Sequence, residues 1–279
     1  MNDTLPPGLY IVATPIGNLQ DVSKRQEITL READIIAAED SRVTAKLLNH
    51  LGIKKRITAY HDHVDESVRA GLVEKLGDKA IALVSDAGTP LISDPGYKLV
   101  RDARAAGYLV TTVPGPCAAI AALTLAGLPT DRFVFAGFLP AKAKARTDAI
   151  RELAAIRATL IFYDSGPRLA KSLQALSAEL GDREAAVARE ISKAFEECVT
   201  GTLDELAARY ADAPPKGEIV IVVGPPGEAD AASEADIDAA LAEALERLPP
   251  GKAAREVAKA LHLPSEGLYE RAMALKTGG

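Results

Sequence analysis

The chain has 279 residues, of which 48% are apolar and 26% charged, so it has enough core material for two ordinary globular domains. A net charge of −6 argues against a protein that coats nucleic acid regardless of sequence. The two cysteines and the lack of a long apolar run exclude a disulfide framework and a membrane span. We therefore expect a cytoplasmic protein without a signal peptide.

In the first half of the chain, short apolar runs alternate with helical patterns. The strands are expected at 9–13, 33–40, 80–86 and 108–115, with helices near 43–51, 67–76 and 96–106. This β–α–β repetition predicts a mostly parallel sheet with right-handed crossovers. Ligands bind at the carboxyl ends of the strands in such sheets, so the loops after these strands are the candidates for a site.

The second half has strands richer in aromatic and β-branched residues. They are expected at 132–138, 158–164, 185–190 and 217–224, with helices near 142–156 and 168–179. Residues 224–236 read as a linker, and helices are expected at 234–247, 251–261 and 265–276. The fold prediction is an α/β protein with a mostly parallel sheet in residues 1–122, a mixed sheet in 123–226, and a linker with a helical tail in 227–279.

The loop "SDAGTPLISDPG", residues 85–96, is unusually rich in turn residues. Gly88 and Gly96 permit backbone conformations that are closed to other residues, and the prolines stiffen the path. Asp86 and Asp94 add acceptors, and the loop has no lysine, so it suits a polar ligand better than a phosphate. The alternative is a structured connection that binds nothing, and composition alone leaves both interpretations open.

Two further strand-end loops have the same character. In residues 12–21, Pro15 and Gly17 end a strand sharply. The segment is either a ligand-binding loop or a simple turn. In residues 113–123, a Pro-Gly-Pro turn leads into a helix of small residues. Small residues there allow a ligand to approach closely, and they equally allow tight packing of helix on sheet.

Three charged segments have an ordinary alternative beside a functional one. Glu39, Asp40 and Arg42 end a predicted strand and would form either acid–base machinery or a braced ion pair. The two histidines in "YHDHVDE", 60–66, resemble a metal site only superficially, and we predict no metal. The mixed charges of 188–197 are typical of a solvated helix face.

Seven motifs in order along the chain resemble one family, the tetrapyrrole-methylase-like methyltransferases that depend on S-adenosylmethionine. The motifs lie at 8–25, 37–42, 85–96, 113–123, 135–140, 188–197 and 217–225, and the likeness extends weakly to 264–275. The motifs "EDSR" and "SDAGTPLISDP" are most similar to those of the branch that methylates the ribose 2′-oxygen of a cytidine in bacterial 16S ribosomal RNA. A tetrapyrrole or protein substrate is the alternative within the same fold.

The resemblance implies two α/β domains with S-adenosylmethionine in the cleft between them, within a homodimer. The positions that match the family's cofactor contacts are Pro15, Asp86, Ala87, Gly88, Thr89, Ile92, Cys117, Ala118, Tyr163, Asp164, Gly217, Glu218 and Ile219. The chain departs from the family pattern at Pro167, where a histidine is expected, and in 60–66, which lacks an asparagine. Since the expected histidine and asparagine are absent from this chain, a catalytic role for either side chain is in doubt.

Methyl transfer to a 2′-hydroxyl benefits from a base that takes its proton. The acidic candidates are Asp21, Glu39, Asp40, Asp86 and Glu197. We prefer Glu39 and Asp40, because they end a strand at the presumed cleft.

The RNA substrate, expected in the 30S subunit, needs cationic partners for its phosphates. The candidates for phosphate contacts are Arg25, Arg42, Lys142, Lys144, Arg146 and Lys193. The basic stretch 141–151 would be either a loop over the RNA or the start of a solvated helix.

A hypothesis of another class is a helix-turn-helix DNA-binding regulator that uses the tail, 251–275. A recognition helix needs several basic and polar side chains, and this one offers mostly Glu266, Glu270 and Arg271. The composition favours an accessory element that dimerises or docks RNA.

Overall fold

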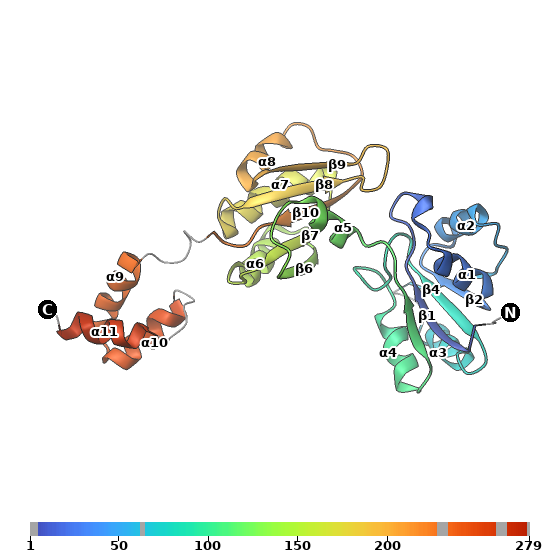
Figure 1. The fold of residues 1–279 in the computed structure, drawn as a ribbon, viewed down its shortest axis with the longest axis horizontal. Coiled ribbons are helices and arrows are strands. Elements are labelled where there is room, and N and C mark those ends of the chain that lie inside the picture. The colour runs from blue at the N-terminus through green and yellow to red at the C-terminus, as the bar shows by residue number, and fades with distance from the viewer. Residues whose placement is uncertain (1–4, 62–64, 228–233, 261–266, 278–279) are drawn as a thin grey trace.

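A computed structural model describes residues 5–61, 65–227, 234–260 and 267–277, which form two five-stranded sheets and a group of three helices (Figure 1). The first sheet has the order β3-β2-β4-β1-β5, and all four pairings in it are parallel. Its strands are β1 (Gly8–Val12), β2 (Ile35–Ala38), β3 (Ile57–Ala59), β4 (Ala80–Val84) and β5 (Val110–Val113).

Helices cover both faces of this sheet, as an all-parallel sheet requires. They are α1 (Lys24–Glu32), α2 (Ser41–His50), α3 (Glu66–Lys75) and α4 (Tyr97–Ala105), while the short 3₁₀ helix η1 (Leu19–Asp21) lies in the loop before α1. Leu30 of α1 and Leu47 of α2 belong to one apolar cluster, and Leu72 of α3 and Leu99 of α4 belong to another. Every residue of the central strand β4 is buried, so the carboxyl ends of the strands are fixed by core packing on both sides.

Gln26 of α1 is a buried polar side chain that supports the loop after β1. Its Nε2 donates to the carbonyl oxygen of Ala13 at 2.8 Å, and its Oε1 accepts from the Ser23 N–H as part of a capping box. Since Gln26 is only 1% exposed, water cannot replace either contact.

We expect Gln26→Ala to lower the free energy of unfolding by about 2 kcal/mol, because the Ala13 carbonyl would lose its partner and α1 its cap. Urea denaturation measures this loss. Gln20→Ala, at an exposed position on the same loop, is the control, and an equal effect of both substitutions would contradict the assignment.

The second sheet is mixed, with the order β6-β7-β10-β8-β9. Only β6 and β7 pair in parallel, and the remaining pairs are antiparallel. Its strands are β6 (Phe133–Phe138), β7 (Thr159–Ser165), β8 (Glu184–Arg189), β9 (Glu197–Thr202) and β10 (Glu218–Val223), and its helices include α6 (Ala143–Ala154), α7 (Gly166–Leu180) and α8 (Leu203–Arg209).

Helix α5 (Ala118–Leu125) follows β5 in the chain and packs on the second sheet (Figure 1). Ala119 and Ala122 share an apolar cluster with Ile161 of β7 and Val220 of β10. The domain boundary between residues 122 and 123 stays a prediction. The packing of α5 leads us to propose that the second unit begins before this helix.

The departure at Pro167 has a local explanation in the structure. The residue lies in the first turn of α7, where a proline gives up a backbone N–H that has no helical partner. The substitution therefore suits the helix start, and Arg168 beside it donates to the carbonyl oxygen of Leu139.

The tail forms three helices, α9 (Glu234–Leu245), α10 (Pro250–Ala260) and α11 (Leu268–Thr277), which contact one another. Leu241, Val257 and Leu268 form part of a small core between them. The guanidinium of Arg271 pairs with Asp238 at 2.5 Å, so a side chain that a recognition helix would offer to DNA is engaged within the tail. Glu266 lies outside the described residues.

The predicted fold class, two α/β domains with a parallel and then a mixed sheet and a helical tail, is confirmed. All eight expected strands are present, whereas β3, β9, α1 and α8 were not expected. The interpretation of 188–197 as a helix face is wrong, because this segment runs from β8 through a turn into β9. Glu190 and Ser192 adopt positive φ values of 50° and 63°, which turn the chain back and let β8 and β9 pair.

Candidate functional site

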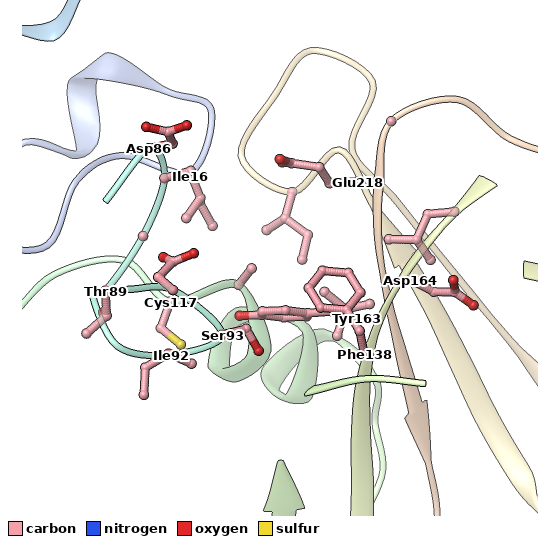
Figure 2. A pocket seen from close by; sticks show the side chains of 18 of the residues that line it. Ile16, Asp86, Thr89, Ile92, Ser93, Cys117, Phe138, Tyr163, Asp164 and Glu218 are labelled. Atoms are coloured by element: carbon pink, nitrogen blue, oxygen red, sulfur yellow. The ribbon is translucent and has the colours of Figure 1, made fainter. Parts of the chain in front are cut away.

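A cavity of about 390 Å³ lies between the two sheets, at the carboxyl ends of β1, β2 and β4. This volume is in the range of small-molecule sites, about 300–1,000 Å³. Figure 2 shows its two walls, with Asp86, Thr89 and Cys117 on one side and Tyr163 and Glu218 on the other. The predicted cleft between the domains is therefore present.

Hydrogen bonds join the three loops of the first wall. Gly88 and Thr14 exchange N–H···O bonds of 2.8 and 3.1 Å between their backbones. The Thr89 hydroxyl donates to the carbonyl oxygen of Pro116 at 2.9 Å. The loops after β1, β4 and β5 thus form one connected surface. The backbone N–H and C=O of Gly88 are both engaged in holding its loop to the loop after β1.

Close approach explains the glycine at 88. Its φ is +82°, and an added Cβ would lie 3.3 Å from Cγ2 of Ile16 and 3.6 Å from the carbonyl oxygen of Pro116. Leu91 and Ser93 in the same loop also have positive φ, 74° and 62°. Side chains at such angles are strained, and the strain is concentrated where the loop lines the cavity.

Tyr163 forms the centre of the second wall. Its ring extends toward Cys117 (Figure 2) and contacts Phe135 and Phe138 edge-on, with centroid distances of 4.8 and 5.5 Å. Its hydroxyl oxygen accepts from the Ala119 N–H at 3.2 Å. Burial raises the pKa of Tyr163 above its ordinary value, so the hydroxyl is neutral at physiological pH.

Asp164, the next residue of β7, contributes to the wall through its backbone. Its carboxylate points away from the cavity (Figure 2), accepts from the Ser165 N–H at 2.8 Å and lies 3.7 Å from Nε of Arg168. Tyr163 and Asp164 face opposite sides of the sheet because successive side chains of a strand alternate in direction.

Lys193 crosses from the second domain to the first. Its stem packs on Gly17, where an added Cβ would lie 2.5 Å from Cε of the lysine. Its Nζ is 3.0 Å from Oε1 of Glu190 and 3.6 Å from Oε2 of Glu218. Burial alone would lower the pKa of Lys193, but the hydrogen bond to Glu190 and the charge of Glu218 raise it. The ammonium is thus held between carboxylates at the rim of the cavity.

Carboxylates dominate the charge of the cavity lining. The acidic residues among the described lining residues are Glu39, Asp86, Asp94, Glu190 and Glu218, together with Asp164, whose carboxylate is turned away, and no Lys, Arg or His is among the described lining residues. Apolar side chains such as Ile16 and Ile92 complete the walls. The lining fits a ligand with both an apolar surface and a positive charge, because carboxylates stabilise a nearby cation.

The two preferred acids differ in their environments. Glu39 lines the cavity, whereas Asp40 does not. Asp40 caps α2 by accepting from the Arg42 N–H at 2.8 Å and binds the guanidinium of Arg42, with Nε 3.0 Å from Oδ1. The hydrogen bond to the Arg42 side chain lowers the pKa of Asp40 to about 2, which makes its carboxylate a weak base.

Most of the predicted cofactor residues lie in the lining, and those that do are Asp86, Ala87, Gly88, Thr89, Ile92, Cys117, Ala118, Tyr163, Asp164, Gly217, Glu218 and Ile219. Pro15 lies outside it, and its neighbour Ile16 lies inside. Asp94, expected as an acceptor of the loop 85–96, also lies in the lining, whereas sequence reasoning missed Ile16, Ser93, Phe138, Ser165, Glu190, Ile191 and Val220. Ser93 and Asp94 belong to the quoted loop 85–96, so its turn composition already marked them.

The residues predicted to contact RNA phosphates lie outside the lining. Arg25 donates to the carbonyl oxygen of Thr112 at 2.9 Å, and Arg42 pairs with Asp40. Lys142 is the N-cap of α6, so the basic stretch is a helix start, and Lys144 within it is exposed. Arg146 donates to the carbonyl oxygen of Ala141 at 3.4 Å.

Within the described ranges, no group of three or more His, Cys, Asp or Glu could hold a metal ion. His61 is described, and the second histidine of 60–66 lies outside the described residues. Across the same part of the chain, none of the helices combines the length and apolar character needed to cross a membrane.

Comparisons with known proteins agree with this architecture. The family model for Tetrapyrrole (Corrin/Porphyrin) Methylases matches residues 8–207, and a model for the RsmI C-terminal HTH domain matches residues 231–276. The chain is 58% identical over 275 residues to the ribosomal RNA small subunit methyltransferase I of Erythrobacter litoralis, covering 99% of this chain and 98% of the relative. It is 46% identical to the protein of the same name from Escherichia coli O157:H7, covering 95% and 94%.

Solved structures show the same fold at low identity. Uroporphyrin-III C-methyl transferase from Thermus thermophilus, complexed with S-adenyl homocysteine, aligns with a TM-score of 0.53 at 20% identity, over 78% of this chain and 97% of that one. The resemblance inferred from the motifs is thus confirmed. The chain belongs to the tetrapyrrole methylase family and, within it, to the group of the ribosomal RNA small subunit methyltransferases I.

Proposed function

We propose that the protein transfers a methyl group from S-adenosylmethionine to the ribose 2′-oxygen of a cytidine in 16S ribosomal RNA. We further propose that it acts in the cytoplasm, as a homodimer, on the 30S subunit. The observation that carries the proposal is the acidic cavity between two walls at the strand ends. The chain is also 58% identical to a protein named for small-subunit ribosomal RNA methylation.

The cavity residues fit S-adenosylmethionine, which, when bound, supplies a methyl group activated on a positively charged sulfur. Ile16 and Ile92 offer apolar surface for the nucleoside, and Asp86 offers an acceptor for hydroxyl groups. The carboxylates of the lining stabilise the positive charge. Since Thr14 and Pro116 hold the loop of the first wall in place, these groups are positioned before the ligand arrives.

Glu39 is the residue we assign to proton transfer. It lies in the cavity wall at the end of β2, where it would accept the proton of the ribose 2′-hydroxyl. The Asp40 carboxylate, engaged by Arg42, would instead hold the start of α2.

We expect Glu39→Gln to reduce kcat by about 100-fold at pH 7.5, as typical for loss of a general base. Asp40→Asn is the matched control and should stay within about threefold of the wild type, since asparagine also caps helices. Single-turnover methyl transfer measures both rates. A pH–rate profile adds a second readout, because the pKa of Asp40, about 2, excludes that group from any inflection near neutral pH. A larger loss in Asp40→Asn than in Glu39→Gln would contradict the assignment.

The test of the function compares substrates. Purified protein is titrated with S-adenosylmethionine by calorimetry and then assayed on 30S subunits that lack the modification, with a uroporphyrinoid as the alternative substrate. We expect cofactor binding and methylation of the 30S subunits only. Methylation of the porphyrinoid would instead favour the other substrate class of the fold, and no binding of the cofactor would refute both.

A DNA-binding role of the tail is the second candidate, because the model that matches 231–276 describes a helix-turn-helix domain. The pairing of Arg271 with Asp238 removes a cation from the surface that would face DNA. We therefore propose that the tail is an accessory element that helps to dock RNA or to dimerise.

A further inference from the structure

We propose that the turn between β8 and β9, together with a basic hollow at its base, is a docking surface for a single-stranded segment of the substrate RNA. In this arrangement Phe195 stacks on a nucleobase, while Arg209 and Lys216 bind phosphates beside it. The proposal rests on the proposed function, since it assigns the surface that receives that substrate.

The charge of the cavity creates the need for a separate phosphate site. The described lining carries carboxylates and no cationic side chain, so it repels the phosphodiester groups that flank the reacting ribose. The ammonium of Lys193 at the rim is held by Glu190 and Glu218. Cations for the phosphates must therefore lie beside the cavity.

A second hollow has this composition. Its volume is about 510 Å³, and its lining consists of Arg189, Glu197, Arg209, Tyr210, Ala213, Pro215 and Lys216. Glu197 lies 2.6 Å from Nε of Arg189 and 4.0 Å from NH2 of Arg209. One carboxylate is thus shared by two guanidinium groups, and Lys216 adds a third positive charge, which leaves the hollow net positive.

The hollow adjoins the cofactor cavity. Lys216 precedes Gly217 and Glu218, and Arg189 precedes Glu190, all three of which line the cavity. Arg189 is also paired in register with Ile219 of β10, another lining residue, and neighbouring strands lie only about 4.8 Å apart. The hollow therefore lies at the same end of the second sheet as the cavity, on the sheet's other face, where Tyr210 packs with Val187 and Ile219. An RNA strand that passes around this end of the sheet would reach both.

Phe195 is the second, independent observation. Its side chain is 76% exposed, the highest value among the large apolar side chains of the described residues. The turn that carries it is well held, because the Ser192 N–H donates to Oε2 of Glu196 at 2.7 Å and the Glu196 N–H donates to the Lys193 carbonyl oxygen at 3.1 Å. An aromatic ring presented in this way, two residues from Glu197 in the hollow, matches sites that combine base stacking with a basic groove.

The first experiment removes the charges. In the double variant Arg209→Ala/Lys216→Ala, we expect KM for 30S subunits to rise about tenfold, with kcat and the affinity for S-adenosylmethionine within about twofold of wild type. The slope of log affinity against log salt should fall by about 1.4, or 0.7 per lost phosphate contact. The control Lys75→Ala/Arg104→Ala removes two exposed cations at the ends of α3 and α4, away from the cavity, and should leave KM unchanged.

The second experiment uses Phe195. The chain contains no tryptophan, so Phe195→Trp introduces a single tryptophan whose emission should be quenched when a protein-free, single-stranded segment of the substrate RNA binds and the indole stacks on a base. Phe195→Ala should raise KM at least about fivefold, and Phe195→Trp should restore it. Light scattering checks that the oligomeric state of each variant is that of the wild type.

The outcomes separate the possibilities. Unchanged KM and salt slope in the double variant, or unquenched emission in Phe195→Trp, would overturn the docking surface. The proposed function would still stand in that case, provided that the wild-type protein methylates 30S subunits. A shift of Phe195→Ala from dimer to monomer would assign the ring to a protein interface instead. Wild-type protein that fails to methylate 30S subunits would refute the proposed function and the docking surface together.

Discussion

The substitution Gly88→Val is expected to weaken S-adenosylmethionine binding by more than about tenfold. The new Cβ would lie 3.3 Å from Ile16 and 3.6 Å from the Pro116 carbonyl oxygen, so Ile16 must give way by a few tenths of an ångström, and the two γ-methyl groups of valine would add to the crowding of the first wall. Overpacking of this kind costs about 1–3 kcal/mol, and 1.4 kcal/mol corresponds to a factor of ten in affinity. Calorimetric titration with the cofactor measures the change.

Gly107→Val separates this effect from backbone strain. Gly107 has a similar φ of +79°, but nothing lies within 4 Å of an added Cβ. Both variants should lose thermal stability because valine is strained at positive φ, and only Gly88→Val should lose cofactor affinity. Equal affinity losses would show that Gly88 matters for the fold alone.

Tyr163→Ala is expected to lower both stability and cofactor affinity. The substitution removes a ring that contacts Phe135 and Phe138 and leaves the Ala119 N–H without its acceptor. Loss of a large aromatic side chain costs about 3 kcal/mol of unfolding free energy, and the opened wall should weaken cofactor binding about tenfold. Urea denaturation and calorimetry provide the two measurements.

Two further variants identify which part of Tyr163 acts. Tyr163→Phe keeps the ring and should cost only about 1 kcal/mol, for one lost hydrogen bond, with affinity within about threefold. Tyr97→Ala, at a ring that is 68% exposed, should change stability by no more than about 0.5 kcal/mol. If Tyr163→Phe behaved like Tyr163→Ala, the hydroxyl and not the ring would be the decisive group.

The architecture was predictable because its signals are local. The run "AIALV" of β4 is buried throughout, and a short, wholly apolar run bounded by turn residues predicts such a strand. Strand β3, "ITA", is too short to show a period, and β9, "ECVTGT", contains a glycine and a charge. Their formation depends on neighbouring strands, which sequence patterns do not describe.

The site was predictable to the extent that it is built from turn-rich loops. Loop 85–96 lines the cavity as its composition indicated, and the resemblance pointed to Tyr163 and Ile219 on the opposite wall. The difference between Glu39 and Asp40 was not predictable, because it depends on where Arg42 folds back. The basic hollow was also missed, since it combines residues from β8, β9, α8 and the segment before β10.

The packing of α5 on the second sheet has a consequence for motion. The chain passes from the first sheet to the second through residues 114–117, so this segment is the hinge about which any relative motion of the two sheets would have to turn. Two prolines fix φ within it, and Gly115 is so close to Gln26 that an added Cβ would lie 2.1 Å from Nε2. With few free torsions, the hinge should permit only slight opening, and a preset cleft reduces the entropy lost when a ligand binds.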